Sequence, residues 1–249
     1  MRFSIIIPAW NEEHTIQRAV YETQAALDTL GDPYEIIVVD DGSRDGTSML
    51  VEQMTSQSLP VRVIRHAENR GKGAAIKTGV LAAMGEWMIF LDADLSVHPS
   101  EISRLVSAMD GTDIVIGSRR VLGATIPEPQ PLMRDLAGRL FNIAVRLMTG
   151  LPYRDTQCGF KAYHRRTIPV FQELETSSWV FDVELLVRSR QRGFIIKEVP
   201  VTWRHGHESR VRWSDARDVF KTLRRMRLIS SPSIISTKAR RSRPRVPEA

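Results

Sequence analysis

The stretches VVDDGS, residues 38–43, and FLDAD, residues 90–94, decide the fold class of this chain. Each begins as an apolar run typical of a buried strand and ends in aspartates. Open α/β sheets bind ligands outside the carboxyl ends of their strands, so both sets of carboxylates are expected at that edge. A D-x-D step also brings two hard oxygen ligands toward one point, which suits Mg²⁺ or Mn²⁺ carried on a diphosphate.

The surrounding segments alternate between strand and helix patterns. FSIIIP, residues 3–8, has the pattern of a buried strand, and residues 14–30 carry apolar side chains at helical spacing. A second strand over 34–39 then implies right-handed crossovers, and the chain is predicted to be an α/β fold with a mostly parallel central sheet flanked by helices. The same patterns predict later strands at 61–65, 86–91 and 113–117, and helices at 73–84, 99–109 and 132–149.

Length and composition favour one domain. A chain of 249 residues without internal repeats fits a single α/β domain over residues 1–229, followed by a basic disordered tail over 230–249. No apolar run reaches the ~18–20 residues needed to cross a bilayer, and we recognise no signal peptide. The single cysteine, Cys158, fits a reducing, cytoplasmic compartment and is interpreted as a small buried residue.

The charge of the chain points to an anionic partner. The formal net charge is +6, and positive residues concentrate past residue 203. Residues 215–229 form an amphipathic basic pattern, to which we give two interpretations. Such a helix lies peripherally on an anionic membrane surface, aided by the basic tail, or it packs its apolar stripe on the domain and leaves its basic face in solvent.

Five motifs, taken in order, make the chain resemble the family 2 glycosyltransferases. They are PAWNE at 8–12, VDDGS at 39–43, NRGKG at 69–73, DAD at 92–94 and GSR at 117–119. The resemblance implies an inverting enzyme of the GT-A fold that uses a nucleotide-activated sugar. Two further stretches resemble the dolichyl-phosphate and polyprenyl-phosphate glucosyl- and mannosyltransferases: DTQCGFK at 155–161 and RHGHESR at 204–210.

The resemblance also implies a donor site. Trp10 offers an aromatic face for the base, Asp41 is expected to bond the base or ribose, and Asp40 is expected to orient the loop. Lys72 is a candidate for donor phosphate, with a solvated lysine as the alternative. The full set of residues expected to bind the donor is Pro8, Trp10, Glu12, Val39, Asp41, Lys72, Asp92, Ala93, Arg204 and Arg210.

Three residues form the predicted catalytic set, Asp92, Asp94 and Arg119. By resemblance, Asp94 coordinates Mg²⁺ or Mn²⁺ and Asp92 bridges the metal and the ribose. The cation would screen charge on the departing diphosphate oxygen. Arg119 stands at the carboxyl end of a strand, where arginine recognises phosphate with two parallel hydrogen bonds.

The acceptor site is predicted to include Arg119, Arg134 and Asp155. The serine that relatives carry one turn after Arg134 is Gly138 here, so one phosphate contact is lost. A polyprenyl phosphate, whose second pKa is about 6, is mostly dianionic at neutral pH and needs no strong general base. A hydroxyl acceptor would need one, and Asp155 and Asp182 are then the candidates.

Three functions compete on this sequence. They are a lipid-phosphate glycosyltransferase at the cytoplasmic membrane face, a family 2 transferase acting on a glycan hydroxyl, and a non-enzymatic basic binding protein. The third leaves the DAD motif unexplained, and no nucleic-acid partner is expected. The arginines of GSR and RHGHESR, with Arg134 and the apolar helix over 132–149, favour the first. DTQCGFK resembles the glucosyl branch, hence UDP-glucose, and RHGHESR resembles the mannosyl branch, hence GDP-mannose; we favour glucose.

Overall fold

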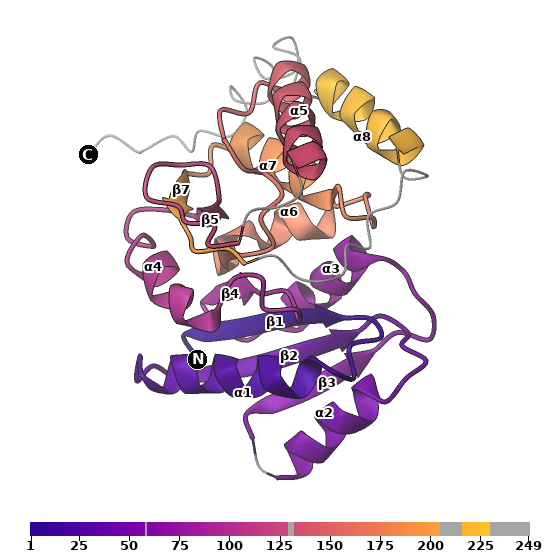
Figure 1. The fold of residues 1–249 in the computed structure, drawn as a ribbon, viewed down its shortest axis with the longest axis vertical. Helices are drawn as coiled ribbons and strands as arrows, with labels where there is room; N and C mark the ends of the chain where they lie inside the picture. The colour runs from indigo at the N-terminus through magenta and orange to yellow at the C-terminus, as the bar shows by residue number, and fades with distance from the viewer. Residues whose placement is uncertain (58, 129–131, 205–215, 230–249) are drawn as a thin grey trace, which may run out of the picture.

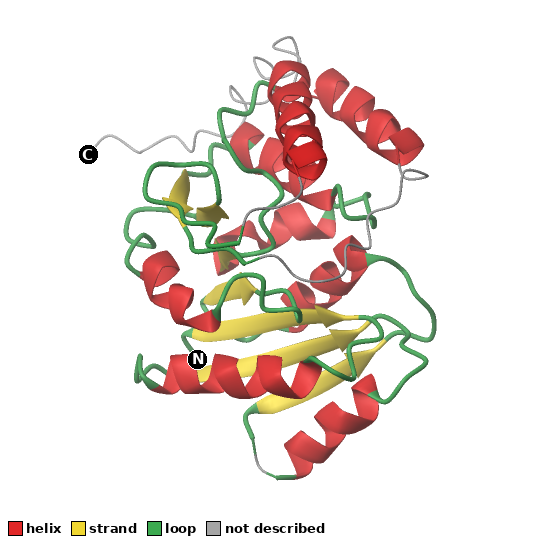
Figure 2. Ribbon diagram, in the orientation of Figure 1, coloured by secondary structure: helices red, strands yellow, loops and turns green. Residues whose placement is uncertain are grey.

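The computed structural model of the chain describes residues 1–57, 59–128, 132–204 and 216–229. Within them, helices flank both faces of one seven-stranded sheet (Figure 1, Figure 2). The strands are β1 (Phe3–Ala9), β2 (Tyr34–Asp40), β3 (Val61–Arg65), β4 (Trp87–Phe90), β5 (Ile114–Ser118), β6 (Lys161–His164) and β7 (Ile196–Pro200). The helices are α1 (Ile16–Asp28), α2 (Thr47–Ser56), α3 (Lys72–Ala82), α4 (Ile102–Val106), α5 (Leu132–Thr149), α6 (Ile168–Gln172), α7 (Phe181–Gln191) and α8 (Ala216–Ile229), with 3-10 turns η1 (Pro99–Glu101) and η2 (Arg165–Thr167).

The sheet has the strand order β3-β2-β1-β4-β6-β5-β7. All neighbouring pairs are parallel except those that β6 makes with β4 and β5. The prediction of a mostly parallel sheet between helices is therefore confirmed, while the reversed strand β6 was not predicted. The helix predicted over 99–109 is shorter in the structure, because η1 occupies its first turn and α4 ends at Val106.

Each face of the sheet packs its own hydrophobic cluster, since successive side chains of a strand point to opposite faces. In β1, Phe3, Ile5 and Ile7 pack with α1, α2 and α4, while Ile6 packs with α3, α6 and α7 on the other side. Helices α5 and α8 join this second cluster through Val145 and through Leu223 and Met226, respectively. The sheet is thus buried on both faces, which explains its nearly continuous apolar strands.

Strand directions gather the motif loops at one edge of the sheet. Strands β1, β2, β4 and β5 all end there, and the antiparallel strand β6 begins there, with Lys161 paired to both Phe90 and Ile116. The segment before β6 therefore enters the sheet between the ends of β4 and β5. This topology brings the DAD, GSR and DTQCGFK motifs to one edge.

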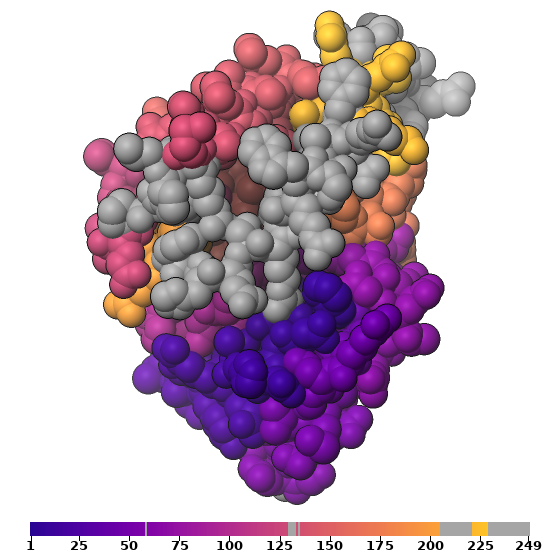
Figure 3. Space-filling model, turned by 45° about the vertical axis from the view of Figure 1, so that its right-hand side comes forward, coloured from indigo at the N-terminus to yellow at the C-terminus, as the bar shows by residue number. Residues whose placement is uncertain are grey.

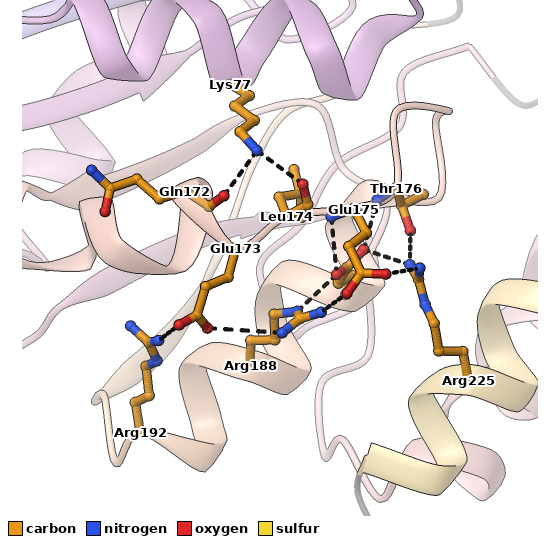
Figure 4. A network of polar contacts seen from close by, with 10 residues as sticks. Lys77, Gln172, Glu173, Leu174, Glu175, Thr176, Arg188, Arg192 and Arg225 are labelled. Atoms are coloured by element: carbon orange, nitrogen blue, oxygen red, sulfur yellow. Dashed lines mark hydrogen bonds and ion pairs between the residues drawn. The ribbon is translucent and has the colours of Figure 1, made fainter.

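Helix α8 is fastened to the domain by apolar and by ionic contacts. Leu223 and Met226 are buried, and Arg225 pairs with Glu175 in the loop before α7 at 2.7 Å (Figure 4) and with Glu184 of α7 at 2.8 Å. Of the two interpretations of residues 215–229, the described part supports packing of the apolar stripe on the domain. Residues 230–249, predicted to be a disordered tail, lie outside the described residues. None of the described helices is both long and apolar enough to span a bilayer.

Candidate active site

The loop after β4 fixes its two aspartates in different ways. It turns at Leu95, whose φ is 54°, and the Leu95 N–H donates to the Asp92 carbonyl at 3.1 Å. The Asp94 carboxylate accepts from the backbone N–H and the hydroxyl of Ser96, each at 2.9 Å. Asp92 instead pairs with Lys72, in the first turn of α3, with 2.5 Å between Nζ and Oδ1. Lys72 is therefore an ion-pair partner in the site rather than a solvated lysine.

The glycine of DTQCGFK makes room for the Asp92 carboxylate. A Cβ built on Gly159 would lie 1.9 Å from Oδ2 of Asp92, far inside any van der Waals contact. With Lys72 on Oδ1 and Gly159 against Oδ2, the Asp92 side chain is held from two sides. Three motifs far apart in the sequence, NRGKG, DAD and DTQCGFK, therefore meet at one carboxylate.

Electrostatic coupling joins these groups into one cluster. Burial raises the pKa of Asp94, and the neighbouring Asp92 carboxylate raises it further against the opposing effect of the Ser96 hydrogen bonds. Burial alone would lower the pKa of Lys72, but the carboxylates of Asp92, Asp182 and Asp94 outweigh burial and raise it. Lys72 is thus firmly cationic among carboxylates whose mutual repulsion a further cation would relieve.

The two aspartates fit a magnesium or manganese ion that arrives with a diphosphate. Mg²⁺ is commonly held by one or two carboxylates together with substrate phosphates. Asp92 and Asp94 supply such a pair of hard oxygen ligands, and the raised pKa of Asp94 reflects a partly buried surplus of negative charge. Across the described residues, no group of three or more His, Cys, Asp or Glu side chains is arranged to hold a metal by itself. Ligation by Asp92 and Asp94 stays a prediction.

Asp41, expected at the base or ribose, is buried and holds the NRGKG loop. The backbone N–H groups of Arg70 and Gly71 donate to its carboxylate at 2.9 and 2.7 Å. Nδ1 of His66 lies 2.7 Å from the same carboxylate. Asp41 therefore has a structural role, because it holds the backbone that directly precedes Lys72. Its contact with a nucleotide stays a prediction.

Hydrogen bonds join the PAWNE loop to the VDDGS loop and to Thr47, the first residue of α2. The Asn11 N–H donates to the Ser43 hydroxyl at 2.9 Å, and the Glu12 N–H donates to the Thr47 hydroxyl at 2.8 Å. Asp40 is fully buried and accepts from the Ser43 N–H at 2.8 Å, as expected for a residue that orients the loop. The first two motifs thus form one interlocked surface at the ends of β1 and β2.

The remaining residues predicted to bind the donor differ in how far their side chains are exposed. Trp10 directly follows β1 and is 37% exposed. Val39 and Ala93 are buried, so their side chains pack in the core below the edge. Pro8 lies opposite Val39 in the register of β1 and β2. None of these positions is tested as a donor contact, and each stays a prediction.

Arg119 follows β5 and is locked to Asp155 by three hydrogen bonds. Nε and Nη2 donate to the carboxylate at 2.7 and 2.9 Å, and the Arg119 backbone N–H donates at 3.0 Å. Burial alone would raise the pKa of Asp155, but the Arg119 guanidinium outweighs it and lowers the pKa. The guanidinium also lies over the Trp203 ring, 5.5 Å from its centroid. The Glu198 carboxylate of β7 accepts from the Asp155 backbone N–H at 2.9 Å, which holds the Asp155 backbone against β7.

Asp182 and Cys158 are occupied by structural contacts. Lys161, fully buried at the start of β6, donates to Asp182 at 2.6 Å and to the Cys158 carbonyl at 2.7 Å. Burial raises the pKa of Asp182, partly offset by Lys161. Burial also raises the pKa of Cys158 to about 12, which fits the interpretation of this residue as a small buried side chain.

The two segments expected to close the site are described only in part. Arg204 is exposed, and its backbone N–H donates to the Ser96 carbonyl at 2.7 Å, which sets it beside the D-x-D loop. Arg210 lies outside the described residues. Arg134 is in the first turn of α5, but its side chain is also outside them. The positions of Arg134 and Arg210 relative to an acceptor stay predictions.

Several contacts at the site were missed from the sequence. Lys161, Glu198 and Trp203 hold Asp182, Asp155 and Arg119, respectively, yet no local pattern pairs residues so far apart in the chain. A signal was present for Lys161, because a lysine between the apolar residues Phe160 and Ala162 indicates either an edge strand or a buried ion pair.

Comparison with known proteins shows which family the chain resembles. The model of glycosyl transferase family 2 matches residues 4–169, well over half of the chain. The dolichyl-phosphate beta-glucosyltransferase of Drosophila melanogaster is 35% identical over 220 residues, covering 82% of this chain and 67% of the relative. The human protein of the same name is 33% identical over 217 residues, covering 81% and 67%.

Other relatives are considerably longer than this chain. Glycosyltransferase AglD of Haloferax volcanii is 30% identical over 213 residues, which cover 84% of this chain but 34% of that protein. The chain likewise spans 65% of the Dictyostelium discoideum dolichyl-phosphate beta-glucosyltransferase.

Solved structures share the fold. Glucosyl-3-phosphoglycerate synthase from Mycobacterium tuberculosis, in complex with phosphoglyceric acid, superposes with a TM-score of 0.67 at 23% identity, covering 93% of this chain and 81% of that one. The same enzyme with Mn²⁺, UDP and glucosyl-3-phosphoglycerate gives a TM-score of 0.63 at 22% identity, covering 94% and 80%. With its family model, its curated relatives and this fold, the chain belongs to glycosyl transferase family 2 and has the GT-A fold.

Proposed function

We propose that the chain is an inverting, metal-dependent glucosyltransferase that moves glucose from UDP-glucose onto a polyprenyl phosphate at the membrane surface. The observation that carries the proposal is the edge of the sheet where the Asp92–Asp94 turn after β4 and Arg119 after β5 are separated by the single strand β6. Lys72 lies at the same edge, paired with Asp92 and influenced by the carboxylates of Asp94 and Asp182. The names of the relatives support the glucose and the lipid phosphate, since four of them are dolichyl-phosphate beta-glucosyltransferases from Dictyostelium, yeast, fly and human.

On the donor side, this chain's residues would bind and orient the nucleotide sugar. Trp10 offers its exposed ring to the base, and the interlocked loops after β1 and β2 support it. Asp92 and Asp94 would hold Mg²⁺ or Mn²⁺, which would neutralise charge on the leaving diphosphate. Lys72 would lie within reach of the same diphosphate through its place beside Asp92. The Mn²⁺ and UDP bound by the mycobacterial synthase support this assignment.

On the acceptor side, Arg119 would orient a phosphate monoester. A phosphate that is already mostly dianionic attacks without a general base, because its second pKa is about 6. The two carboxylates that could serve a hydroxyl acceptor are engaged elsewhere: Asp155 with Arg119 and Asp182 with Lys161. These pairings support the phosphate acceptor over the hydroxyl acceptor. Attack by a separate acceptor on the face opposite the diphosphate would invert the anomeric carbon.

The proposal is tested by transfer of labelled sugar. The purified chain is incubated with Mn²⁺ or Mg²⁺, with UDP-glucose or GDP-mannose, and with a polyprenyl phosphate or its unphosphorylated alcohol. We expect label in the organic phase from UDP-glucose and the phosphate. Label from GDP-mannose alone, or equal transfer to the alcohol, would contradict the assigned donor or acceptor.

A variant pair separates acceptor from donor binding. Arg119→Lys keeps the charge but loses the guanidinium group that Asp155 fixes in place, and Arg134→Ala removes the second predicted acceptor contact. Loss of a charge-assisted hydrogen bond of ~1.5–3 kcal/mol corresponds to a roughly ten- to hundredfold rise in KM for polyprenyl phosphate. UDP affinity should change little in either variant. A parallel loss of UDP affinity would assign these arginines to the donor instead.

A further inference from the structure

The apolar surface of helix α5 is wider than the part that packs on the domain. Its inner side, with Phe141, Val145 and Met148, packs into the hydrophobic cluster shared with α7 and α8. Beside this inner side runs a second row of large apolar residues, all exposed, at successive spacings of three and four residues, and we call this row the outer stripe: Met133, Leu136, Leu140, Ile143 and Leu147. That spacing keeps the residues on one face, over ~21 Å of helix at 1.5 Å per residue.

Within the described residues, no packing contact accounts for the outer stripe. A helix that buries one side against a domain normally turns a polar side to water. Here Met133 and Leu147 are 79% and 82% exposed, among the most exposed large apolar side chains in the described part of the chain. Helix α8 does not cover the stripe with its own apolar side, because Leu223 and Met226 are buried in the inner cluster. A contiguous apolar row of this kind marks an interaction surface.

The positive charges around the stripe indicate which kind of partner it contacts. Arg139 and Arg146 lie along one border of the stripe on α5, and both are exposed. Helix α8 contacts α5 and turns Lys221, Arg224 and Arg227 outward. Both helices lie at the end of the molecule away from β3, where they form part of its surface (Figure 1, Figure 3).

This surplus of positive charge complements anionic lipid head groups. It opposes a second copy of the same face, which would bring like charges together. Asp135, on the same turn of α5, pairs with Arg120 and Arg139 and offsets one of these charges, so the face keeps a net positive charge.

We propose that the outer stripe of α5 is a membrane-docking face, which enters the head-group boundary of an anionic bilayer while the flanking arginines bind lipid phosphates. The proposal deepens the proposed function and rests on it for the lipid acceptor. The Arg120–Asp135 ion pair, at 2.5 Å, ties the first turns of α5 to the end of β5. Docking by α5 would therefore bring Arg119 close to the plane in which a lipid-linked phosphate lies.

Vesicle binding by matched double variants tests the docking face. Leu140→Gln with Leu147→Gln removes two stripe residues and keeps good helix formers. Met49→Gln with Leu81→Gln is the control, since these residues are also exposed and apolar but belong to α2 and α3. We measure co-sedimentation with vesicles of phosphatidylcholine, with and without phosphatidylserine.

For the stripe variant we expect at least about tenfold weaker binding to the anionic vesicles, because each leucine contributes apolar burial. The control variant should bind like the parent chain. Parent binding should require phosphatidylserine, and Arg146→Gln should weaken its dependence on salt.

Two outcomes overturn the docking face. Equal vesicle binding by stripe and control variants, with the far-UV circular dichroism of both unchanged, would remove the stripe from the contact. A dimer in analytical ultracentrifugation that the stripe variant dissociates, without vesicle binding by the parent, would assign the face to a second copy of the chain. Transfer to a detergent-dispersed polyprenyl phosphate is measured in parallel, because its absence counts against the proposed function and not against docking.

Discussion

Asp92 is held so closely that the shape of its surroundings matters as much as its charge. Lys72 engages one oxygen, and the bare backbone of Gly159 lies against the other. These two contacts restrict the rotation of the Asp92 side chain, which would favour the role predicted for it as a ligand of a metal and a ribose. Small changes at Gly159 should therefore act through Asp92.

Gly159→Ala should lower transfer by ~10²–10³-fold, the range seen when a single electrostatic stabiliser is lost. The added methyl group collides with Asp92 and must displace it. Steady-state transfer from UDP-glucose measures the effect. Gly138→Ala, in α5 with nothing closer than 3.9 Å to the new Cβ, is the matched control and should be neutral. Full activity of Gly159→Ala would mean that Asp92 need not keep this position.

Asp155→Asn should destabilise the fold by roughly 3 kcal/mol at neutral pH, since it leaves the guanidinium of Arg119 without its charged partner. The pKa of Asp155 is lowered in the folded state, so its stabilising effect is complete above the unfolded pKa of about 3.9 and is lost as the pH falls through the folded pKa. The difference in the free energy of unfolding between parent and variant should therefore become smaller below about pH 4.

Urea unfolding at pH 7 and near pH 3 measures this difference. Asp110→Asn, at an exposed aspartate, is the control and should follow the parent at both pH values. A constant difference between Asp155→Asn and the parent across this range would show that the Arg119–Asp155 ion pair does not contribute through its charge.

At the scale of elements, one loop connects the C-terminal helix to the start of α3. Residues 173–176 accept hydrogen bonds from Lys77 of α3 and ion pairs from Arg188 of α7 and Arg225 of α8 (Figure 4). The next residue, Ser177, accepts the Gly73 N–H at 2.7 Å, one position after Lys72. The loop therefore braces the helix that carries Lys72.

Arg225→Ala should lower the free energy of unfolding by about 1–2 kcal/mol. Arg225 donates to Glu175, Thr176 and Glu184, but it is partly exposed, and Arg188 still pairs with the buried Glu184 after the change. Guanidinium chloride unfolding measures the loss. Arg224→Ala, at the exposed neighbouring arginine, should be nearly neutral. Equal effects of the two changes would indicate that the ionic contacts of α8 do not stabilise the fold.

The sequence predicted those elements whose pattern is local. Strands β1 and β2 are apolar runs buried on both faces, so their type and direction follow from pattern and connection alone. Strand β6 is four residues long and includes the buried Lys161, whose burial depends on Asp182 in a later helix. Helix α5 was predicted as an apolar helix over 132–149, and in the structure part of its apolar surface packs on the domain while the outer stripe stays exposed.

The candidate site was predictable to the same extent. Its carboxylates and Arg119 stand at strand ends, where a motif and a strand pattern suffice to place them. Their partners could not be predicted, because Asp155 reaches Arg119 across 36 residues and Asp41 reaches the Gly71 N–H across 30. Such pairings depend on strand order, which the sequence does not encode locally.

At the scale of the molecule, the site draws on loops from both halves of the sheet. A ligand that touches them all should stabilise the whole chain. UDP with Mn²⁺, at about a hundred times its Kd, should add about 2.7 kcal/mol, which raises Tm by roughly 5–10 °C in a chain of this size. Thermal unfolding followed by circular dichroism measures the shift.

Removing the metal with EDTA should abolish most of this shift. Asp94→Asn should do the same, while Asp110→Asn should leave it intact. An undiminished shift with UDP in EDTA would separate nucleotide binding from the metal.

The Arg119–Asp155 ion pair also links the two ends of the segment that contains α5. The chain leaves the sheet at Arg119, forms α5 and returns at Asp155, and the ion pair joins the two ends at their base. Directly below, Ile116 of β5 is already paired with Lys161 of β6. A force applied to α5 is therefore opposed by this ion pair and by the β5–β6 hydrogen bonds, together with the core packing of Val145. Asp92 and Asp94 follow β4, on the other side of β6, so they lie outside this linked segment and such a force would reach them only through the sheet.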